Sequence, residues 1–241
     1  MARVEAQKIE RPLRGLSVCF DLDGTLVHTA PDLVRVTNEI IALEGLPETD
    51  YAPAARVVGF GSRALLQGAF ERAGHSVSDP RMDELQRMFL LRYAHDITRL
   101  SAPYPGVVDT LEILRSEGAE LSVCTNKPGW LARPLLDALH MSRFFARIVG
   151  GDEAPRSKPD ARHVFAAAGH RDACRIAMVG DSWPDVRAGH NARVFTALVT
   201  YGYSADPQIR LRADARLRNV RELAPALRAW YRPAGTGQRS G

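Results

Sequence analysis

Five short apolar runs, each close to a stretch with helical periodicity, constrain the fold of this chain more than any other feature. The runs cover residues 16–22, 121–125, 147–150, 175–179 and 196–200, and helical stretches near 107–117, 132–142, 161–168 and 185–192 alternate with them. Strands that are apolar along their whole length are typical of a parallel sheet buried on both faces. The sequence therefore predicts an α/β fold whose parallel sheet carries helices on both faces.

Residues 29–101 interrupt this alternation. This segment predicts helices only, at 32–43, 62–73 and 82–98, separated by glycine and proline. An all-helical segment inserted directly after the first strand indicates a cap over the active edge of the sheet. We therefore expect a discontinuous core domain of residues 14–28 and 102–232, an inserted cap domain of residues 29–101, and flexible tails at 1–13 and 233–241.

Composition excludes several classes of protein. With 45% hydrophobic and 25% charged residues the chain lies in the ordinary globular range. Its apolar runs are much shorter than the roughly 20 residues needed to cross a bilayer, and residues 1–14 do not resemble a signal peptide. We therefore expect a cytoplasmic protein, either a monomer or a homodimer, without a membrane partner.

The formal charge of +4 is concentrated near the C-terminus. Between residues 210 and 241, eight arginines accompany only Asp214 and Glu222, so the rest of the chain is slightly acidic. This distribution argues against a nucleic-acid partner and favours a solvated basic face.

The three cysteines lie far apart, each inside or beside an apolar run. We predict that Cys19, Cys124 and Cys174 are buried and reduced, and the lack of a CxxC pair argues against a zinc site.

Two carboxylates, Asp21 and Asp23, stand at the end of the first predicted strand. Acidic groups at the mouth of an apolar strand are unfavourable unless a cation joins them. Gly24 then permits a tight turn and a close approach of the backbone. Because an Asp-Gly pair is also an ordinary turn, this motif alone is weak evidence for a site.

Further polar residues follow the other predicted strands. Thr125, Asn126 and Lys127 follow the second strand, Lys158 lies in the loop after the third, and Asp181 and Asp185 follow the fourth. The chain has only three lysines among its 32 basic residues, and two of them fall in these segments. Since the carboxyl ends of parallel strands meet at one edge, the pattern predicts a shared site for an anion and a metal ion.

In their order and spacing these motifs resemble those of the haloacid dehalogenase superfamily of phosphatases. DxDGT at 21–25, Thr125, Lys158 and GDSxxD at 180–185 carry the resemblance, which covers about residues 14–232. It looks closest to the phosphoglycolate phosphatase subgroup, from FDLDGTLVHTAPDL, VCTNKP, VGGDE with SKPD, VGDSWPD and VTYGY. The resemblance implies a Rossmann-like core, a helical cap, Mg²⁺ as cofactor and a small phosphorylated metabolite, 2-phosphoglycolate, as substrate.

The resemblance also implies roles for the acidic residues. Asp21 would attack phosphorus and form an aspartyl-phosphate, which water then hydrolyses. Asp23 would protonate the leaving oxygen and then activate the water. Asp21, Asp181 and the backbone carbonyl of Asp23 would hold Mg²⁺, which prefers oxygen ligands. Asp185 would orient Lys158 or a metal-bound water, the alternative being a residue that only favours the helix dipole.

Four residues are implied in phosphate binding: Gly24, Thr125, Asn126 and Lys158. For Thr125 the alternative is a hydroxyl that only caps the following turn. We expect Ser182 to cap the helix that follows it, and Trp183 to pack or to form a wall of the site.

Two cations, Arg63 and Lys127, are candidates for substrate specificity. Gly59 to Arg63 would place a helix N-terminus and a guanidinium against a substrate carboxylate. The alternatives are a solvated first-turn arginine and a solvated loop lysine.

Two residues depart from the family pattern. His28 is expected as a polar linker residue. Arg193 stands where the family usually ends a helix with glycine, which puts the geometry there in doubt.

Single residues argue against some other reactions and leave others open. Asp23 argues against dehalogenation, and the lack of any lysine in residues 29–101 excludes Schiff-base cleavage of phosphonates. Sugar-phosphate phosphatase or mutase, nucleotidase and pyrophosphatase activities stay open. A different class, a non-catalytic phospho-ligand binding module with its basic tail on RNA, predicts phosphate affinity without turnover.

Overall fold

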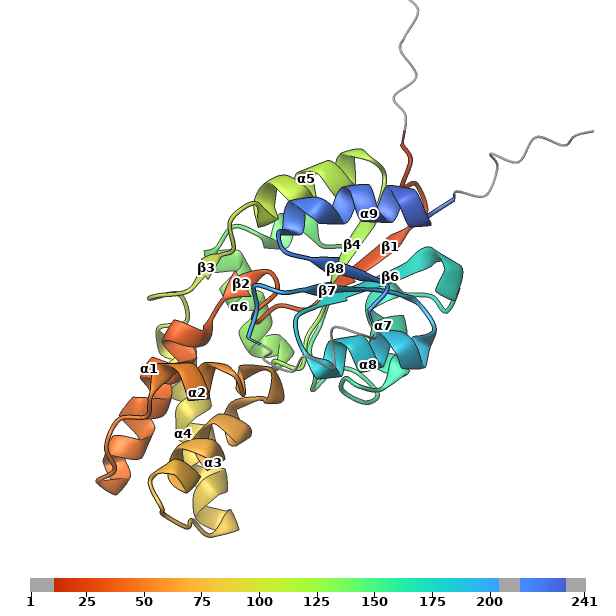
Figure 1. Cartoon of the computed structure of the whole chain (residues 1–241). Helices are drawn as coiled ribbons and strands as arrows, with labels where there is room; N and C mark the ends of the chain where they lie inside the picture. The colour runs from red at the N-terminus through yellow and green to blue at the C-terminus, as the bar shows by residue number, and fades with distance from the viewer. Residues whose placement is uncertain (1–10, 204–212, 233–241) are drawn as a thin grey trace, which may run out of the picture.

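The computed structural model of the protein describes residues 11–203 and 213–232, in which six strands form one parallel sheet (Figure 1). The strand order is β5-β4-β1-β6-β7-β8. The strands are β1 Ser17–Phe20, β4 Glu120–Cys124, β5 Arg147–Val149, β6 Ile176–Gly180, β7 Phe195–Val199 and β8 Ala215–Leu217. The predicted parallel sheet is confirmed, and β8 is a strand that the sequence analysis did not foresee.

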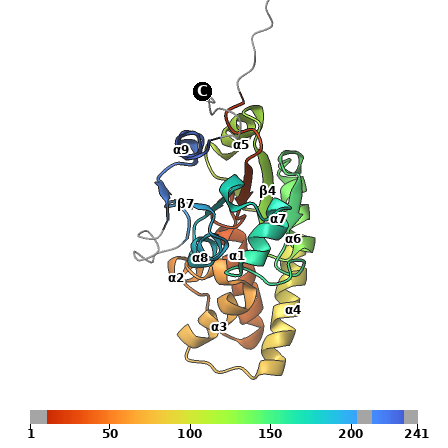
Figure 2. The ribbon, with the colours of Figure 1, turned by 90° about the vertical axis from the view of Figure 1, so that its right-hand side faces the viewer.

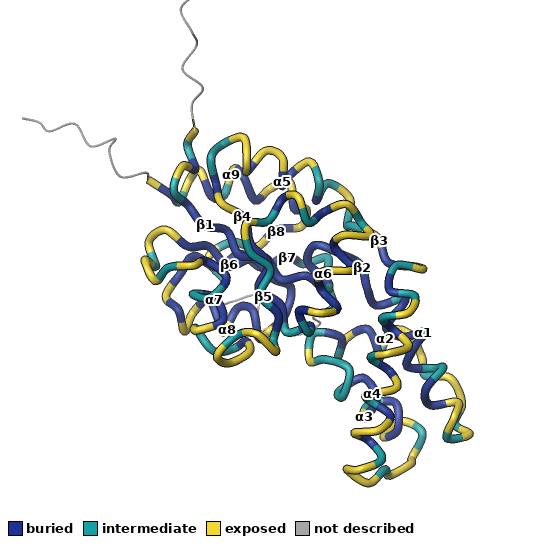
Figure 3. Tube along the Cα trace, turned by 180° about the vertical axis from the view of Figure 1, so that it is seen from behind, coloured by how far each residue is buried: buried dark blue, intermediate teal, exposed yellow. Residues whose placement is uncertain are grey.

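Helices cover both faces of the sheet, as predicted. One face packs against α5 (Val107–Ser116), α6 (Gly129–Ala138) and α9 (Leu223–Trp230), and the other against α7 (Ala161–Ala168) and α8 (Trp183–Ala192). In β1, Val18 and Phe20 enter the first cluster while Cys19 enters the second, because successive side chains of a strand point to opposite faces. Figure 3 shows strands β1, β6 and β7 as buried along their length.

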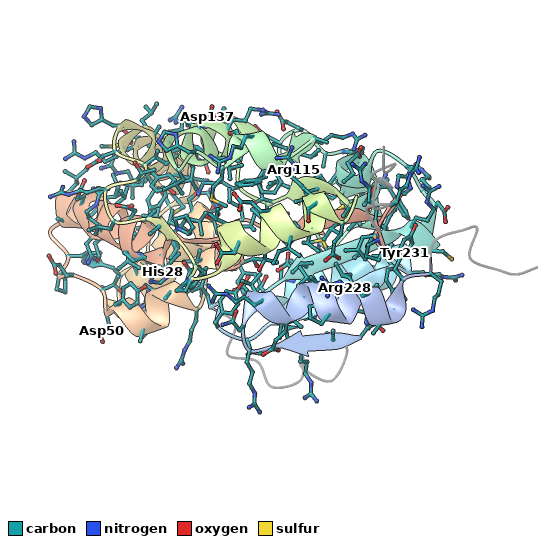
Figure 4. The ribbon with its side chains drawn as sticks, turned by 90° about the horizontal axis from the view of Figure 1, so that it is seen from above. His28, Asp50, Arg115, Asp137, Arg228 and Tyr231 are labelled. Atoms are coloured by element: carbon teal, nitrogen blue, oxygen red, sulfur yellow. The ribbon has the colours of Figure 1, made fainter. Side chains whose placement is uncertain are left out.

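The N-terminal end of the described chain is anchored under α9. Leu13 is fully buried, and its backbone N–H donates to the Glu117 carbonyl at 3.0 Å. Tyr231, just after α9, donates its hydroxyl to the Arg14 carbonyl at 3.0 Å (Figure 4). The tail predicted for 1–13 is therefore wrong for residues 11–13, and residues 1–10 and 233–241 lie outside the described part.

Residues 29–101 contain helices and no strand, as predicted, and form a separate layer beside the sheet (Figures 1 and 2). On α4, Leu85, Phe89 and Tyr93 recur every four residues and are buried. The short helix α2 was not expected. The bounds are α1 Ala30–Ile41, α2 Tyr51–Ala55, α3 Ser62–Arg72 and α4 Asp79–His95.

Two very short strands, β2 (Val27–His28) and β3 (Ala102–Pro103), pair antiparallel where the chain enters and leaves the helical layer. The His28 ring is not a free linker group, because its Nδ1 lies 3.1 Å from the hydroxyls of both Tyr104 and Tyr203. Burial lowers the pKa of His28, so the neutral imidazole is favoured here.

Beside the β2–β3 pair, a buried carboxylate joins the two segments in which the chain enters and leaves the helical layer. Asp32, on α1, is fully buried. Its Oδ2 accepts hydrogen bonds from the backbone N–H groups of Leu100 (2.9 Å) and Ser101 (2.8 Å) and from the Ser101 hydroxyl (2.7 Å). Arg35 donates to the other oxygen. One side chain thus fixes the start of the helical layer to its end.

We expect Asp32→Ala to lower the free energy of unfolding by about 2–4 kcal/mol, because buried donors lose their acceptor. Asp32→Asn keeps the shape and one acceptor oxygen, so its loss should be smaller. Urea unfolding measures both, with Asp50→Ala as an exposed control in the same layer. An Asp32→Ala variant as stable as the control contradicts this anchoring role.

Three smaller sequence predictions have different outcomes. Cys19 and Cys124 are buried, but Cys174 is exposed because it lies in a short turn before β6 rather than in the strand. Arg193 ends α8 in a left-handed conformation with φ of 57°, the conformation that a glycine would adopt there. Among the described helices, none is long and apolar enough to cross a membrane.

Candidate active site

A cavity of about 200 Å³ lies between the carboxyl edge of the sheet and the helical layer. Its wall on the sheet side carries carboxylates, a hydroxyl and two lysines, whereas the helical side is mostly apolar. The sheet contributes Asp21, Asp23, Thr125, Asn126, Lys127, Lys158 and Asp185, and the helical layer contributes Leu33, Val58, Phe60, Leu65, Phe89, Leu90 and Tyr93. The strand ends therefore meet at one site, as the topology requires.

Asp21 and Asp23 lie directly after β1, with a tight turn behind them. Gly24 has φ of 88°, and a Cβ there would stand 2.5 Å from Asp181 Oδ2. Both the left-handed backbone and the close approach require glycine at this position. The turn brings the end of β1 against the end of β6.

Lys158 is the central cation of the site. Its side chain is 2% exposed, and Nζ donates to Asp21 Oδ1 at 2.7 Å and to Asp185 Oδ1 at 2.6 Å. Burial by itself lowers the pKa of Lys158, but the charges of Asp185 and Asp21 raise it above its ordinary value. The lysine is thus held as a charged ammonium between two carboxylates.

The loop after β6 positions two further carboxylates. Asp185 Oδ2 accepts from the backbone N–H (3.0 Å) and hydroxyl (2.6 Å) of Ser182, which confirms Ser182 as the cap of α8. Asp181 is buried and accepts from the Tyr203 backbone N–H at 2.6 Å. Trp183, by contrast, is 43% exposed and is not among the residues that line the cavity.

The carboxylates of Asp21, Asp181 and Asp185 form a cluster that suits a divalent cation. One oxygen from each lies within 4.8 Å of the others. Burial, opposed by Lys158, raises the pKa of Asp21 to about 7, and burial with the neighbouring carboxylates raises that of Asp181 well above its usual range. With Asp23 included, four carboxylates face two ammonium groups at this edge. The excess of two negative charges fits a hard dication.

Thr125 and Asn126 make local contacts in the loop after β4. The Thr125 hydroxyl accepts from the Lys127 backbone N–H at 3.2 Å and so caps the turn. The Asn126 side chain accepts from the Lys158 N–H (2.9 Å) and donates to the Lys158 carbonyl (3.1 Å). Asn126 therefore ties the lysine loop to the end of β4, while both residues line the cavity.

Lys127 is buried, so the alternative of a solvated loop charge is wrong. Its side chain is 4% exposed, and Nζ lies 3.2 and 3.3 Å from the two Asp23 oxygens and 3.1 Å from the Tyr93 hydroxyl. These contacts join the end of β4, the end of β1 and helix α4. Burial lowers the pKa of Lys127, but the charge of Asp23 and the hydrogen bond to the Tyr93 hydroxyl outweigh it and raise this pKa to about 12.

Arg63 lies on the wall of the same cavity, but its guanidinium has acidic partners of its own. It donates to Asp79 at 3.0 Å and to Asp83, both on α4, and its side chain is 34% exposed. The structure thus places the two specificity candidates differently, with Lys127 beside Asp23 and Arg63 paired on the helical layer.

Two tyrosines of this region were missed by the sequence analysis. Tyr93 ends the apolar stripe of α4 and meets Lys127, and Tyr203 supplies the N–H that contacts Asp181. A phenolic hydroxyl at the last position of an apolar helical stripe is a signal that would have found Tyr93. Tyr203 follows β7 in the YGY sequence. Its contact with Asp181, after β6, depends on the fold and has no signal in the local sequence.

Comparison with known proteins finds one matching hydrolase family and similar phosphatases. The family profile described as haloacid dehalogenase-like hydrolase matches residues 18–199. A phosphoglycolate phosphatase of Caulobacter vibrioides is 43% identical over 89% of this chain and 91% of its own length. An N-acetylmuramic acid 6-phosphate phosphatase of Pseudomonas aeruginosa is 35% identical over 89% of this chain and 96% of its own.

Among solved structures, a predicted phosphoglycolate phosphatase of Haemophilus somnus superposes with a TM-score of 0.80 at 29% identity, covering 89% of this chain and 98% of the other.

Proposed function

The chain belongs to the haloacid dehalogenase-like hydrolase family, and on this basis we propose that it is a Mg²⁺-dependent phosphatase acting through Asp21 on 2-phosphoglycolate. One observation carries the proposal: Asp21, which lines the cavity, shares a buried lysine with Asp185 and stands beside Asp23. A nucleophile, an acid/base and a phosphate-binding cation are thereby within reach of one substrate.

The proposed reaction has two steps. Asp21 attacks phosphorus, the bond from phosphorus to the leaving oxygen breaks, and Asp23 gives that oxygen a proton. Asp23 then takes a proton from water, whose oxygen attacks phosphorus and releases the Asp21 carboxylate and inorganic phosphate. Lys158 and the Thr125 hydroxyl bind phosphoryl oxygens throughout, and Asp185 positions Lys158.

Asp21, Asp181 and the backbone carbonyl of Asp23 hold the metal ion in this proposal. Bound there, Mg²⁺ would neutralise charge between a carboxylate nucleophile and a phosphate, which otherwise repel each other. Tyr203 supports this set, because its N–H binds the Asp181 oxygen that faces the Gly24 turn.

Two observations support 2-phosphoglycolate as the substrate. The phosphoglycolate phosphatase of Caulobacter vibrioides reported above is 43% identical to this chain. The cavity, at about 200 Å³, is also smaller than the roughly 300–1,000 Å³ of ordinary small-molecule sites, which favours a two-carbon acid over a sugar. The experiment is phosphate release across a panel of 2-phosphoglycolate, N-acetylmuramic acid 6-phosphate, sugar phosphates, nucleotides and pyrophosphate. Phosphate binding without turnover of any of them would favour the non-catalytic binding module.

We expect EDTA to remove the activity and Mg²⁺ or Mn²⁺ to restore it, because the carboxylate cluster needs a dication before phosphate can approach. Ca²⁺ should bind yet support less than about a tenth of the Mg²⁺ rate, since it favours a larger and looser shell. Steady-state assays with metal content checked by atomic emission test this. Full activity in metal-free enzyme contradicts the proposed site.

A further inference from the structure

A buried ammonium group lies where the sheet and the helical layer meet. Lys127 Nζ contacts both oxygens of Asp23 and the hydroxyl of Tyr93, and it lies 4.4 Å from the centre of the Tyr93 ring. Lys127 follows β4 in the core, whereas Tyr93 is on α4. The environment of this cation is therefore complete only when both layers are in place.

Resting on the proposed function, we propose that Lys127, held by Tyr93, binds the carboxylate of the substrate and selects phosphorylated hydroxy acids over phosphate monoesters without a carboxylate. In the proposed reaction the leaving oxygen lies beside Asp23. In 2-phosphoglycolate a single methylene separates that oxygen from the carboxylate. A carboxylate so close to Asp23 is also close to the ammonium that touches both Asp23 oxygens.

The contact distances show that Lys127 has capacity for a second anion. Charge-assisted N–H···O bonds are ordinarily about 2.7–2.9 Å long. Lys158 has two of this kind, at 2.7 and 2.6 Å, whereas the Lys127–Asp23 contacts are 3.2 and 3.3 Å. An ammonium has three N–H donors, and here they face the two Asp23 oxygens and the Tyr93 hydroxyl, so Lys127 can bind a substrate carboxylate and keep Tyr93 by releasing one of its long Asp23 contacts.

The other charges of the cavity favour the same assignment. Among the described residues that line it, the cations are Arg63, Lys127 and Lys158. Lys158 is engaged by Asp21 and Asp185, and Arg63 pairs with Asp79 and Asp83 at the exposed end. The opposite wall carries apolar side chains such as Leu65 and Phe89, and its uncharged polar groups include Ser62 and Gln86, so it supplies no further cation.

The test compares 2-phosphoglycolate with its amide, 2-phosphoglycolamide, which has nearly the same size but no carboxylate charge. We expect wild type to prefer the acid in kcat/KM by about 10- to 100-fold, the effect of one charged contact. Lys127→Met keeps an unbranched side chain without charge, and it should reduce this preference to about one. Lys127→Arg should restore part of it, and Tyr93→Phe should weaken it while leaving the fold intact.

The preference, rather than the absolute rate, decides the outcome, because a change at Lys127 also disturbs Asp23 and slows both substrates. An equal loss on both substrates in Lys127→Met, with the preference unchanged, overturns the proposal. If Arg63→Ala alone removes the preference, the carboxylate is bound at Arg63 instead. If Lys127→Met does not fold, Tyr93→Phe decides instead. An unchanged preference for the acid over the amide in Tyr93→Phe overturns the proposed role of Lys127 and Tyr93. Failure of wild type to hydrolyse either compound refutes the proposed function, a result distinct from all of these.

Discussion

Asp21→Asn is expected to lower turnover of 2-phosphoglycolate by at least about 10⁴-fold, which corresponds to about 5.4 kcal/mol of activation free energy. Asparagine keeps the shape of the side chain but lacks the anionic oxygen that attacks phosphorus in the proposed mechanism. One oxygen of Asp21, Oδ1, lies 2.7 Å from Lys158 Nζ, and Asp21 lines the cavity. Because no comparable nucleophile replaces it, residual activity should be close to background.

The fold should survive this change. Burial, opposed by Lys158, raises the pKa of Asp21 to about 7, so the charged carboxylate is unfavourable at this position in the absence of a metal ion. We therefore expect the Tm of Asp21→Asn to lie within a few degrees of wild type. Rapid-quench intact-mass measurements should show a transient adduct of one phosphoryl group in wild type and none in the variant.

The matched control is Asp109→Asn, which changes an exposed aspartate paired with Arg221 and should leave kcat unchanged. Retention of more than a tenth of wild-type activity in a properly folded Asp21→Asn protein would rule out covalent catalysis by this residue.

Lys158→Arg is expected to lower kcat/KM by at least about 10³-fold although it conserves charge, a loss of about 4.1 kcal/mol in transition-state binding. The ammonium is a point donor between Asp21 and Asp185, in a site where its side chain is 2% exposed. A planar guanidinium is larger and presents its donors in a fixed fork, so it displaces one carboxylate or the phosphoryl group.

Overpacking at this position should also cost about 1–3 kcal/mol of stability, visible in thermal unfolding. The control is the reverse exchange at the surface, Arg162→Lys, where the guanidinium pairs with Asp160 and is 45% exposed. Near-normal kcat/KM in Lys158→Arg contradicts the assignment of Lys158 as the phosphate-binding point charge.

Most of the sheet could be predicted because its strands are continuously apolar, a pattern that depends on local sequence alone. β8 escaped because Ala215–Leu217 is short and lies in an arginine-rich segment, where charge hides the strand. The β2–β3 ribbon has two residues on each side, too few for any periodicity to show.

The main carboxylates and Lys158 could be predicted to lie together because each follows a strand, and the ends of parallel strands converge. The environments of Lys127 and Arg63 were not predictable in the same way. Whether these cations are buried or exposed depends on α4, whose Tyr93 meets Lys127 and whose Asp79 and Asp83 pair with Arg63. Such contacts between layers leave no periodic mark on the sequence.

The β2–β3 ribbon has a consequence for how this enzyme diversifies. Because Val27 pairs with Pro103 and His28 with Ala102, the chain leaves the sheet and returns to it at adjacent points. A helical segment of different length or composition can be exchanged there as a cassette without altering the register of any sheet strand. A different helical segment would thus give the cavity a different wall while the residues that follow the sheet strands keep their places.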